Sequence, residues 1–279
     1  MKLSVIIPAR DEEESIGQVI REIKNVLPES EIIVVNDASR DSTPLIALRE
    51  GAKVINTNSP QGYGKALKIG IGEAKYPVIA IIDGDGTYPA DLLPSLVKEI
   101  GKFDMVIGAR DPRKIPWLRR PAKGLLQFLA SYLMGQKIPD LNSGMRVFKR
   151  EIIQEFYHLL PDGFSFTSTL TLAALSEGYG VKFVPILYFP RKGRSKINPL
   201  RDTFNFFLLI IRTILYFNPL KVFLPLSFFL LSLGLFILLY TALVLGKVMD
   251  ITSIVVILTG VQVGVLGLLA DLIVRRLKK

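Results

Sequence analysis

Two aspartates one residue apart, Asp83 and Asp85, follow an apolar run at residues 78–82. The run predicts a buried strand, and the glycines beside the aspartates let both carboxylates turn toward one point at its end. Carboxylate oxygens suit Mg²⁺ and Mn²⁺, and a corner with only two of them leaves coordination positions for substrate phosphates. The pattern therefore predicts a divalent-metal site for a substrate that carries a diphosphate.

Two other interpretations of this segment stay open. Residues 83–86 resemble the start of a calcium loop, but the twelfth position is Pro94 instead of glutamate, and a strand precedes the loop instead of a helix. The second alternative is a simple turn between a strand and a helix. Its weakness is that paired acids repel each other unless a cation neutralises them.

The surrounding chain alternates between strand and helix signals, which predicts an α/β fold with a mainly parallel sheet and helices on both faces. The expected strands are residues 3–8, 31–36, 53–56, 78–83, 105–109 and 181–187, and the expected early helices are residues 12–26, 42–50 and 64–74. In such sheets, ligands bind beyond the carboxyl ends of the strands.

Charged residues follow the predicted strands at this edge. They are Arg10 and Glu12, Asp37, the pair Asp83 and Asp85, and Arg110. Together they predict a site, although each alone also fits a turn or a helix cap. Capping is the favoured interpretation for Asp41 or Ser42, which precede a predicted helix. Asp37 directly follows its strand, where a carboxylate can accept hydrogen bonds from a base or a ribose.

The composition changes near residue 218. Residues 222–245 and 251–270 carry no charge, and each run is long enough for a helix to cross a bilayer. We expect two transmembrane helices at about 222–245 and 251–274, within a segment 219–279; buried core helices are the alternative. Basic residues flank the pair, so the domain with the acidic corner and the C-terminus are expected in the cytoplasm, at the cell membrane. Residues 198–218 mix aromatic and charged residues, which predicts an amphipathic interface helix or a further core helix.

The chain carries a net charge of +10 and no cysteine. The lack of cysteine fits a reducing compartment. Many basic residues lie between the acidic corner and the first span, where some suit anionic lipid and others suit substrate phosphates. Nucleic acid is not an expected partner, because no recognition motif is present and two spans follow. Gly260, Gly264 and Gly267 predict a homo-oligomer contact through the spans.

The ordered motifs at residues 5–13, 34–43, 83–85, 140–148 and 191–196 resemble those of family 2 glycosyltransferases with the GT-A fold. More narrowly, the chain resembles the polyprenyl-phosphate sugar transferases, which include dolichyl-phosphate mannose synthase and undecaprenyl-phosphate glycosyltransferases. The resemblance implies a catalytic domain at residues 1–197, a UDP- or GDP-sugar donor, a dolichyl or undecaprenyl phosphate acceptor, and Mg²⁺ or Mn²⁺.

The resemblance also implies a role for each matching residue. Pro8, Arg10, Glu12 and Asp37 would line the nucleotide pocket, Asp83 and Asp85 would hold the metal, and Arg110 and Arg120 would face the acceptor phosphate. Arg146, Arg191 and Lys196 would lie on a loop that closes over the site, and Asp140 would orient the acceptor or an arginine, with a catalytic-base role as the alternative.

Three departures from the family pattern affect donor identity more than the reaction: Asn36 replaces a frequent aspartate, Thr87 replaces a metal-binding glutamine, and residues 166–170 lack an acid. The expected activity is inverting transfer of a sugar to a polyprenyl phosphate on the cytoplasmic leaflet. Transfer to another lipid, such as a diacylglycerol, is the enzymatic alternative, and a catalytically silent membrane scaffold is the other.

Overall fold

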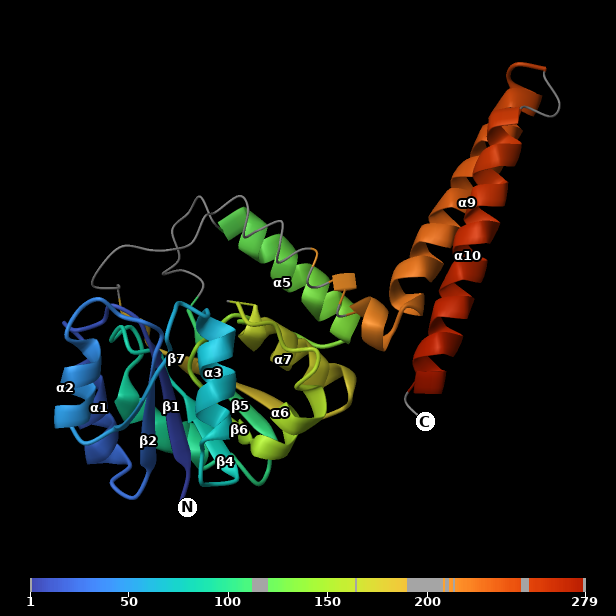
Figure 1. Cartoon of the computed structure of the whole chain (residues 1–279). Coiled ribbons are helices and arrows are strands. Elements are labelled where there is room, and N and C mark those ends of the chain that lie inside the picture. The colour runs from blue at the N-terminus through green and yellow to red at the C-terminus, as the bar shows by residue number, and fades with distance from the viewer. Residues whose placement is uncertain are drawn as a thin grey trace. The chain divides into compact units, whose positions relative to one another are not determined.

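The computed structural model describes residues 2–111, 120–163, 165–189, 208, 211–212, 214–246 and 251–277. It divides into two compact units, Met1–Leu209 and Ile210–Lys279. The first unit contains a β-sheet with its covering helices, and the second contains two long apolar helices (Figure 1).

The sheet has seven strands in the order β3-β2-β1-β4-β6-β5-β7. The strands are β1 (Ser4–Ala9), β2 (Glu31–Asn36), β3 (Lys53–Asn56), β4 (Val78–Ile81), β5 (Met105–Arg110), β6 (Arg146–Lys149) and β7 (Val181–Ile186). Neighbouring strands are parallel except for β6, which runs antiparallel to β4 and β5. The carboxyl ends of the six parallel strands therefore share one edge with the first residue of β6.

All six predicted strands are present, and the mainly parallel sheet is confirmed. The sequence analysis missed β6, because this four-residue strand begins with an arginine and follows a polar turn. It inserts between β4 and β5, with Arg146 opposite Ile81 on one side and Ile107 on the other.

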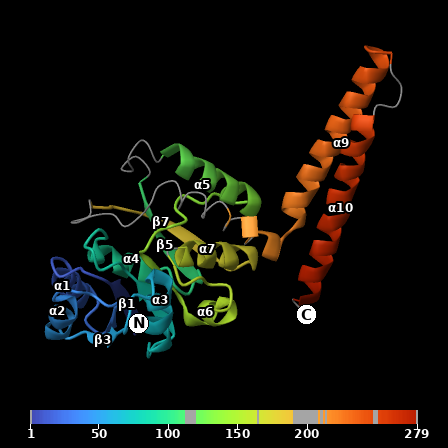
Figure 2. The same ribbon diagram turned by 45° about the horizontal axis from the view of Figure 1, so that its top comes forward.

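Helices cover both faces of the sheet (Figures 1 and 2). One face carries α1 (Ile16–Val26), α2 (Thr43–Arg49), the short 3₁₀ helix η1 (Ala90–Leu92) and α4 (Leu93–Val97). The other carries α3 (Tyr63–Gly72), α6 (Arg150–Phe156) and α7 (Phe166–Ser176), and α5 (Arg120–Met134) contacts α7.

The packing follows from residue spacing. In α1, Ile16, Val19, Ile20 and Ile23 follow the i, i+3, i+4, i+7 pattern of one helix face, and all four are buried. Burying each such side chain contributes about 1.5–3 kcal/mol. On the other face, α3 approaches the sheet through Gly70, where an added Cβ would lie 2.5 Å from a methyl carbon of Ile6.

In the second unit, α9 (Leu220–Leu243) and α10 (Ile251–Leu277) pair along their length. Both are long and apolar enough to cross a membrane, and little of either is buried within the structure. Within their own unit the two helices leave most of their apolar surface uncovered, which favours membrane spans over core helices. The predicted spans agree with the observed helices within about three residues, a difference typical of helix ends.

The glycines of the α9–α10 hairpin lie at the contact between its two helices. Gly234 of α9 lies against Ile257, while Gly260 and Gly267 of α10 lie against Leu231 and Phe223. An added Cβ at Gly267 would come 2.5 Å from the Cβ of Phe223. These small residues let the two helices of one chain approach closely. The predicted oligomer contact through Gly260, Gly264 and Gly267 is therefore not supported.

The predicted interface helix at residues 198–218 lies largely outside the described residues. Within it, residues 208, 211–212 and 214–217 are helical. The structure therefore does not test whether one amphipathic helix spans this segment.

Candidate active site

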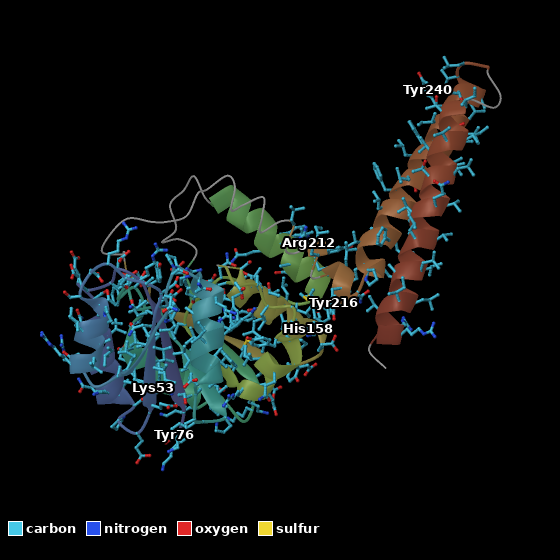
Figure 3. The ribbon with its side chains drawn as sticks, viewed as in Figure 1. Lys53, Tyr76, His158, Arg212, Tyr216 and Tyr240 are labelled. Carbon is cyan, nitrogen blue, oxygen red and sulfur yellow. The ribbon has the colours of Figure 1, made fainter. Side chains whose placement is uncertain are left out.

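The predicted site residues gather at the carboxyl edge of the sheet. Arg10 follows β1, Asp37 follows β2, Asp83 follows β4 and Arg110 ends β5. Arg146 reaches the same edge because β6 runs in the opposite direction. The opposite edge is marked by Lys53, the first residue of β3, and by Tyr76, which precedes β4 (Figure 3).

Asp83 and Asp85 are half-buried, and each is held by neighbouring groups. The Tyr63 hydroxyl donates a hydrogen bond of 2.8 Å to Asp83 Oδ1. The backbone N–H and hydroxyl of Thr87 donate to Asp85 Oδ1 at 3.1 and 2.6 Å. The carboxylates are thus oriented by separate donors, although they lie only one residue apart in the chain.

This pair fits a divalent cation that also contacts substrate. Within the described part of the chain, no group of three or more acidic, histidine or cysteine side chains is arranged to hold a metal. Mg²⁺ commonly takes one or two carboxylates and completes its shell with water and substrate phosphates. Two oriented aspartates at an open sheet edge match that donor set, so Asp83 and Asp85 are the residues that would hold it.

Arg110 and Asp140 form a bidentate ion pair. The guanidinium Nε and Nη2 donate to the two Asp140 oxygens at 2.6 and 2.9 Å, and the Arg110 backbone N–H donates at 3.2 Å. The Asp140 side chain is fully buried, while Arg110 keeps 19% of its side chain exposed. The guanidinium also lies 5.3 Å from the ring centre of Tyr188.

The electrostatics of this pair favour its charged form. Burial alone would lower the pKa of Arg110, but Tyr88 and Asp140 outweigh it, and the net pKa lies above its usual value. An Asp140 carboxylate that is buried and clamped by arginine is poorly placed to accept a substrate proton. Asp140 thus holds the Arg110 guanidinium in one orientation, and its role in a reaction stays a prediction.

The structure corrects the placement of Arg146. This residue begins β6 and is fully buried, so it does not lie on a loop that closes over the site. Its guanidinium donates to the Ser143 carbonyl, to the Thr167 carbonyl at 2.9 Å and to the Thr171 hydroxyl at 3.1 Å. Burial lowers its pKa to about 10. Arg146 therefore ties β6 to α7 and leaves a positive charge beneath the acidic corner.

Asp37 is buried and holds the loop that leads into α3. Its Oδ1 accepts hydrogen bonds from the Gln61 backbone N–H at 2.7 Å and the Thr57 hydroxyl at 3.2 Å, and its Oδ2 accepts from the Gly62 N–H at 3.0 Å. The preceding Asn36 donates to Asn56 at 2.9 Å, which ties β2 to β3. Asp37 thus shapes one wall of the site through the backbone of this loop.

The loops after β1 and β2 are linked by reciprocal hydrogen bonds. The Glu12 N–H donates to the Thr43 hydroxyl at 2.8 Å, the Glu13 N–H donates to Asp41 at 3.1 Å, and the Arg40 N–H donates to Asp11 at 2.8 Å. Asp11 and Ala38 have φ angles of +54°, which non-glycine residues rarely adopt. The linked loops hold Arg10 and Glu12 in place, while Pro8 is buried within β1.

The capping prediction holds for Asp41. Its Oδ1 accepts hydrogen bonds from the Thr43 N–H at 3.0 Å and from the Thr43 hydroxyl at 2.5 Å. The Ser42 side chain makes no capping hydrogen bond. Burial acts to raise the pKa of Asp41, but the hydrogen bonds from Thr43 and Glu13 outweigh it and lower the pKa below its usual 3.8.

Three predicted residues cannot be placed in the site by their side chains. Arg120 is the first residue of α5, and only its backbone is described. Arg191 and Lys196 lie outside the described residues.

Sequence reasoning missed Tyr63, Tyr88 and Gly144. Tyr63 contacts Asp83, and the Tyr88 hydroxyl accepts a hydrogen bond of 2.8 Å from the Gly144 N–H. An added Cβ at Gly144 would lie 2.3 Å from Asp83 Oδ2, so only glycine fits there. The sequence signal that could have pointed to Tyr63 is the glycine on each side of it, Gly62 and Gly64, which is typical of a turn into a helix.

The comparisons with known proteins agree with this geometry. Residues 4–157 match glycosyl transferase family 2, and residues 218–275 match the GtrB C-terminal hairpin. A dolichyl-phosphate hexose transferase of Haloferax volcanii is 34% identical over 201 residues, which cover 71% of this chain and 87% of that protein. The glycosyltransferase AglJ of the same organism is 29% identical over 283 residues, covering 96% of this chain and 92% of AglJ.

The fold is also found in glucosyl-3-phosphoglycerate synthase from Mycobacterium tuberculosis, solved with Mn²⁺, UDP-glucose and phosphoglyceric acid. That structure has a TM-score of 0.61 and 21% identity, and it covers 76% of this chain and 79% of the synthase. The chain belongs to glycosyl transferase family 2. Its GT-A fold agrees with that assignment.

Proposed function

We propose that this chain is a membrane-attached, metal-dependent, inverting glycosyltransferase that moves a sugar from a nucleotide-sugar donor to a polyprenyl phosphate. The observation that carries the proposal is that one chain combines an oriented aspartate pair at the sheet edge with two helices long enough to cross a membrane. The dolichyl-phosphate hexose transferase supports this acceptor class, because it is 34% identical over 71% of this chain.

The donor is a UDP- or GDP-sugar. Pro8, Arg10, Glu12 and Asp37 form the nucleotide side of the site, and Asp83 and Asp85 hold Mg²⁺ or Mn²⁺ against the donor diphosphate. A cation held by these two residues would supply positive charge that offsets the negative charge growing on the leaving diphosphate. Mn²⁺ and UDP-glucose occupy a structure of the same fold, which supports this arrangement.

The acceptor is a dolichyl or undecaprenyl phosphate. Arg110 and Arg120 bind its phosphate, with Arg191 and Lys196 contributing from the segment outside the described residues. A guanidinium has five N–H groups, and Arg110 donates two of them to the Asp140 carboxylate. Asp140 thereby fixes the direction of Arg110.

The reaction forms a bond between an acceptor phosphate oxygen and the anomeric carbon, and it breaks the bond from that carbon to the donor diphosphate. Attack from the opposite face inverts the anomeric configuration. Because a phosphate monoester is already ionised at neutral pH, the acceptor needs positioning more than it needs a general base.

The catalytic unit and the C-terminus face the cytoplasm, as the flanking basic residues indicate. Because the chain has no native cysteine, single cysteines can report this topology. In right-side-out vesicles, a membrane-impermeant maleimide is expected to label Lys247→Cys and to leave Lys2→Cys unlabelled until the vesicles are opened. The reverse pattern would contradict the orientation.

Turnover of the donor tests the proposed site. Detergent-solubilised full-length protein is incubated with radiolabelled UDP- and GDP-sugars, polyprenyl phosphate, and Mg²⁺ or Mn²⁺. We expect label in extractable lipid, loss of transfer on chelation, and loss of transfer in Asp85→Asn. Folded protein with no turnover on any donor would favour the membrane scaffold instead.

A further inference from the structure

Asp83 is confined from two sides. On one side, the Tyr63 hydroxyl donates to Oδ1 at 2.8 Å. On the other, Gly144 lies so close that an added Cβ would come 2.3 Å from Oδ2 and 2.6 Å from Cγ. The carboxylate thus has little freedom to rotate or withdraw.

Tyr63 is itself held by rigid backbone. It is the first residue of α3 and follows Gly62, whose φ of +99° favours glycine. Beside it, Gly64 packs against the loop at residues 161–163, where an added Cβ would lie 2.3 Å from the Pro161 carbonyl oxygen. The Lys65 N–H also donates to the Asp162 carbonyl at 3.0 Å. The position of the Tyr63 hydroxyl therefore depends on a fixed helix start.

The contact suits an ionised carboxylate. A donor to an ionised oxygen stabilises the charged form, which offsets part of the repulsion between neighbouring acids. The Tyr63 hydroxyl is the donor in this contact, because an ionised carboxylate only accepts hydrogen bonds.

We propose that Tyr63 is a positioning residue that orients Asp83 to receive the divalent cation. This inference rests on the proposed function, because it assigns a cation to Asp83. Tyr63 acts through the carboxylate and does not contact the substrate. Groups that orient metal ligands in this way typically contribute about 10–100-fold to metal affinity.

The test compares Mn²⁺ binding by wild-type protein and Tyr63→Phe, which keeps the ring and removes only the hydroxyl. Free Mn²⁺ is measured by electron paramagnetic resonance on full-length protein in detergent, with UDP and GDP as separate probes. We expect about tenfold weaker Mn²⁺ binding, at the low end of the usual range. We also expect a higher Mn²⁺ requirement for transfer and recovery of kcat when Mn²⁺ is saturating.

Two control variants show whether a change in Mn²⁺ binding is specific to the proposed metal site. Tyr179→Phe removes a tyrosine hydrogen bond to Glu155 elsewhere in the same unit, and it should leave Mn²⁺ binding unchanged. Asp85→Asn should weaken Mn²⁺ binding severely. If Asp85→Asn binds Mn²⁺ normally, the proposed metal site fails, and the role of Tyr63 fails with it.

Other outcomes overturn the positioning role alone. Normal Mn²⁺ affinity in Tyr63→Phe, with weakened binding in Asp85→Asn, would show that Asp83 needs no orientation from Tyr63. A lower melting temperature with unchanged Mn²⁺ affinity would show a purely structural role. A loss of kcat that saturating Mn²⁺ does not restore would also contradict the proposal.

Discussion

At the scale of single residues, the Arg110–Asp140 pair combines a fully buried carboxylate with a mostly buried guanidinium. Both Asp140 oxygens accept from Arg110, and Oδ1 also accepts from the Asn142 N–H at 3.3 Å. Such a pair is sensitive to the loss of either partner, because the remaining charge stays buried.

We therefore predict that Asp140→Asn lowers the free energy of unfolding by about 3 kcal/mol, at the low end for a broken buried pair because Arg110 is partly exposed. Asp104→Asn is the matched control. Asp104 pairs with Lys149 in a more exposed ion pair, so its loss should lower stability by at most about 1 kcal/mol. Urea unfolding in detergent measures both. Unchanged stability in Asp140→Asn, with turnover abolished, would instead indicate a direct role as a base.

Asp41 makes the loop contacts sensitive to acid. Its folded pKa is lowered, so its ionised form stabilises the folded protein at pH values well above 3.8. This contribution declines as the pH falls below 3.8 and disappears below the folded pKa. Thermal unfolding from pH 6 to pH 3 should show that Asp41→Asn is destabilised at the upper end and approaches the wild type at the lower end. A difference that does not vary with pH would contradict this assignment.

The site residues differ in how far sequence reasoning could place them. Asp83 and Asp85 were predictable because an apolar strand leads directly to them. The burial of Arg146 was not predictable, because its partners Thr167 and Thr171 lie more than twenty residues away in the sequence. An arginine in a polar motif is also usually exposed at the protein surface. The Tyr63–Asp83 contact could not be predicted either, because it depends on how α3 packs against β1 and β2.

At the scale of elements, the central parallel strands β1, β2, β4 and β5 were predictable because each contains an apolar run. The insertion of β6 between β4 and β5 was not predictable, because a four-residue strand has too few residues to show a periodic hydrophobic pattern. Its antiparallel direction matters for the site, because it brings residues 143–146 to the same edge as Asp83.

An engineered disulfide can test whether Gly264 of α10 contacts Ser227 of α9 within one chain. The Cβ position at Gly264 lies 3.6 Å from the Cβ of Ser227, which is within the separation of about 3.5–4.5 Å found in disulfides. The chain has no native cysteine. We predict that Ser227→Cys combined with Gly264→Cys forms a disulfide within one chain under oxidising conditions.

Non-reducing gel electrophoresis with a protease site inserted at residues 247–250 measures this disulfide. The cleaved double variant should keep its two fragments together until a reductant is added, while either single variant should separate at once. A crosslinked dimer of two full chains would contradict the assignment and restore the oligomer contact.

At the scale of the whole molecule, the chain joins two units with different surroundings. The sheet unit buries its apolar residues, while α9 and α10 expose large apolar side chains along their length. Exposed surface of this kind is stable in lipid and unfavourable in water. A donor that is soluble in water and an acceptor that is anchored in lipid fit this division.

The measurement that tests the central claim most directly is the identity of the labelled lipid. Full-length protein receives a labelled nucleotide sugar and equal amounts of polyprenyl phosphate and diacylglycerol. We predict label only in a lipid that mild acid hydrolyses, that requires the polyprenyl phosphate, and that is absent with Asp85→Asn. Label in an acid-stable product from diacylglycerol would contradict the claim.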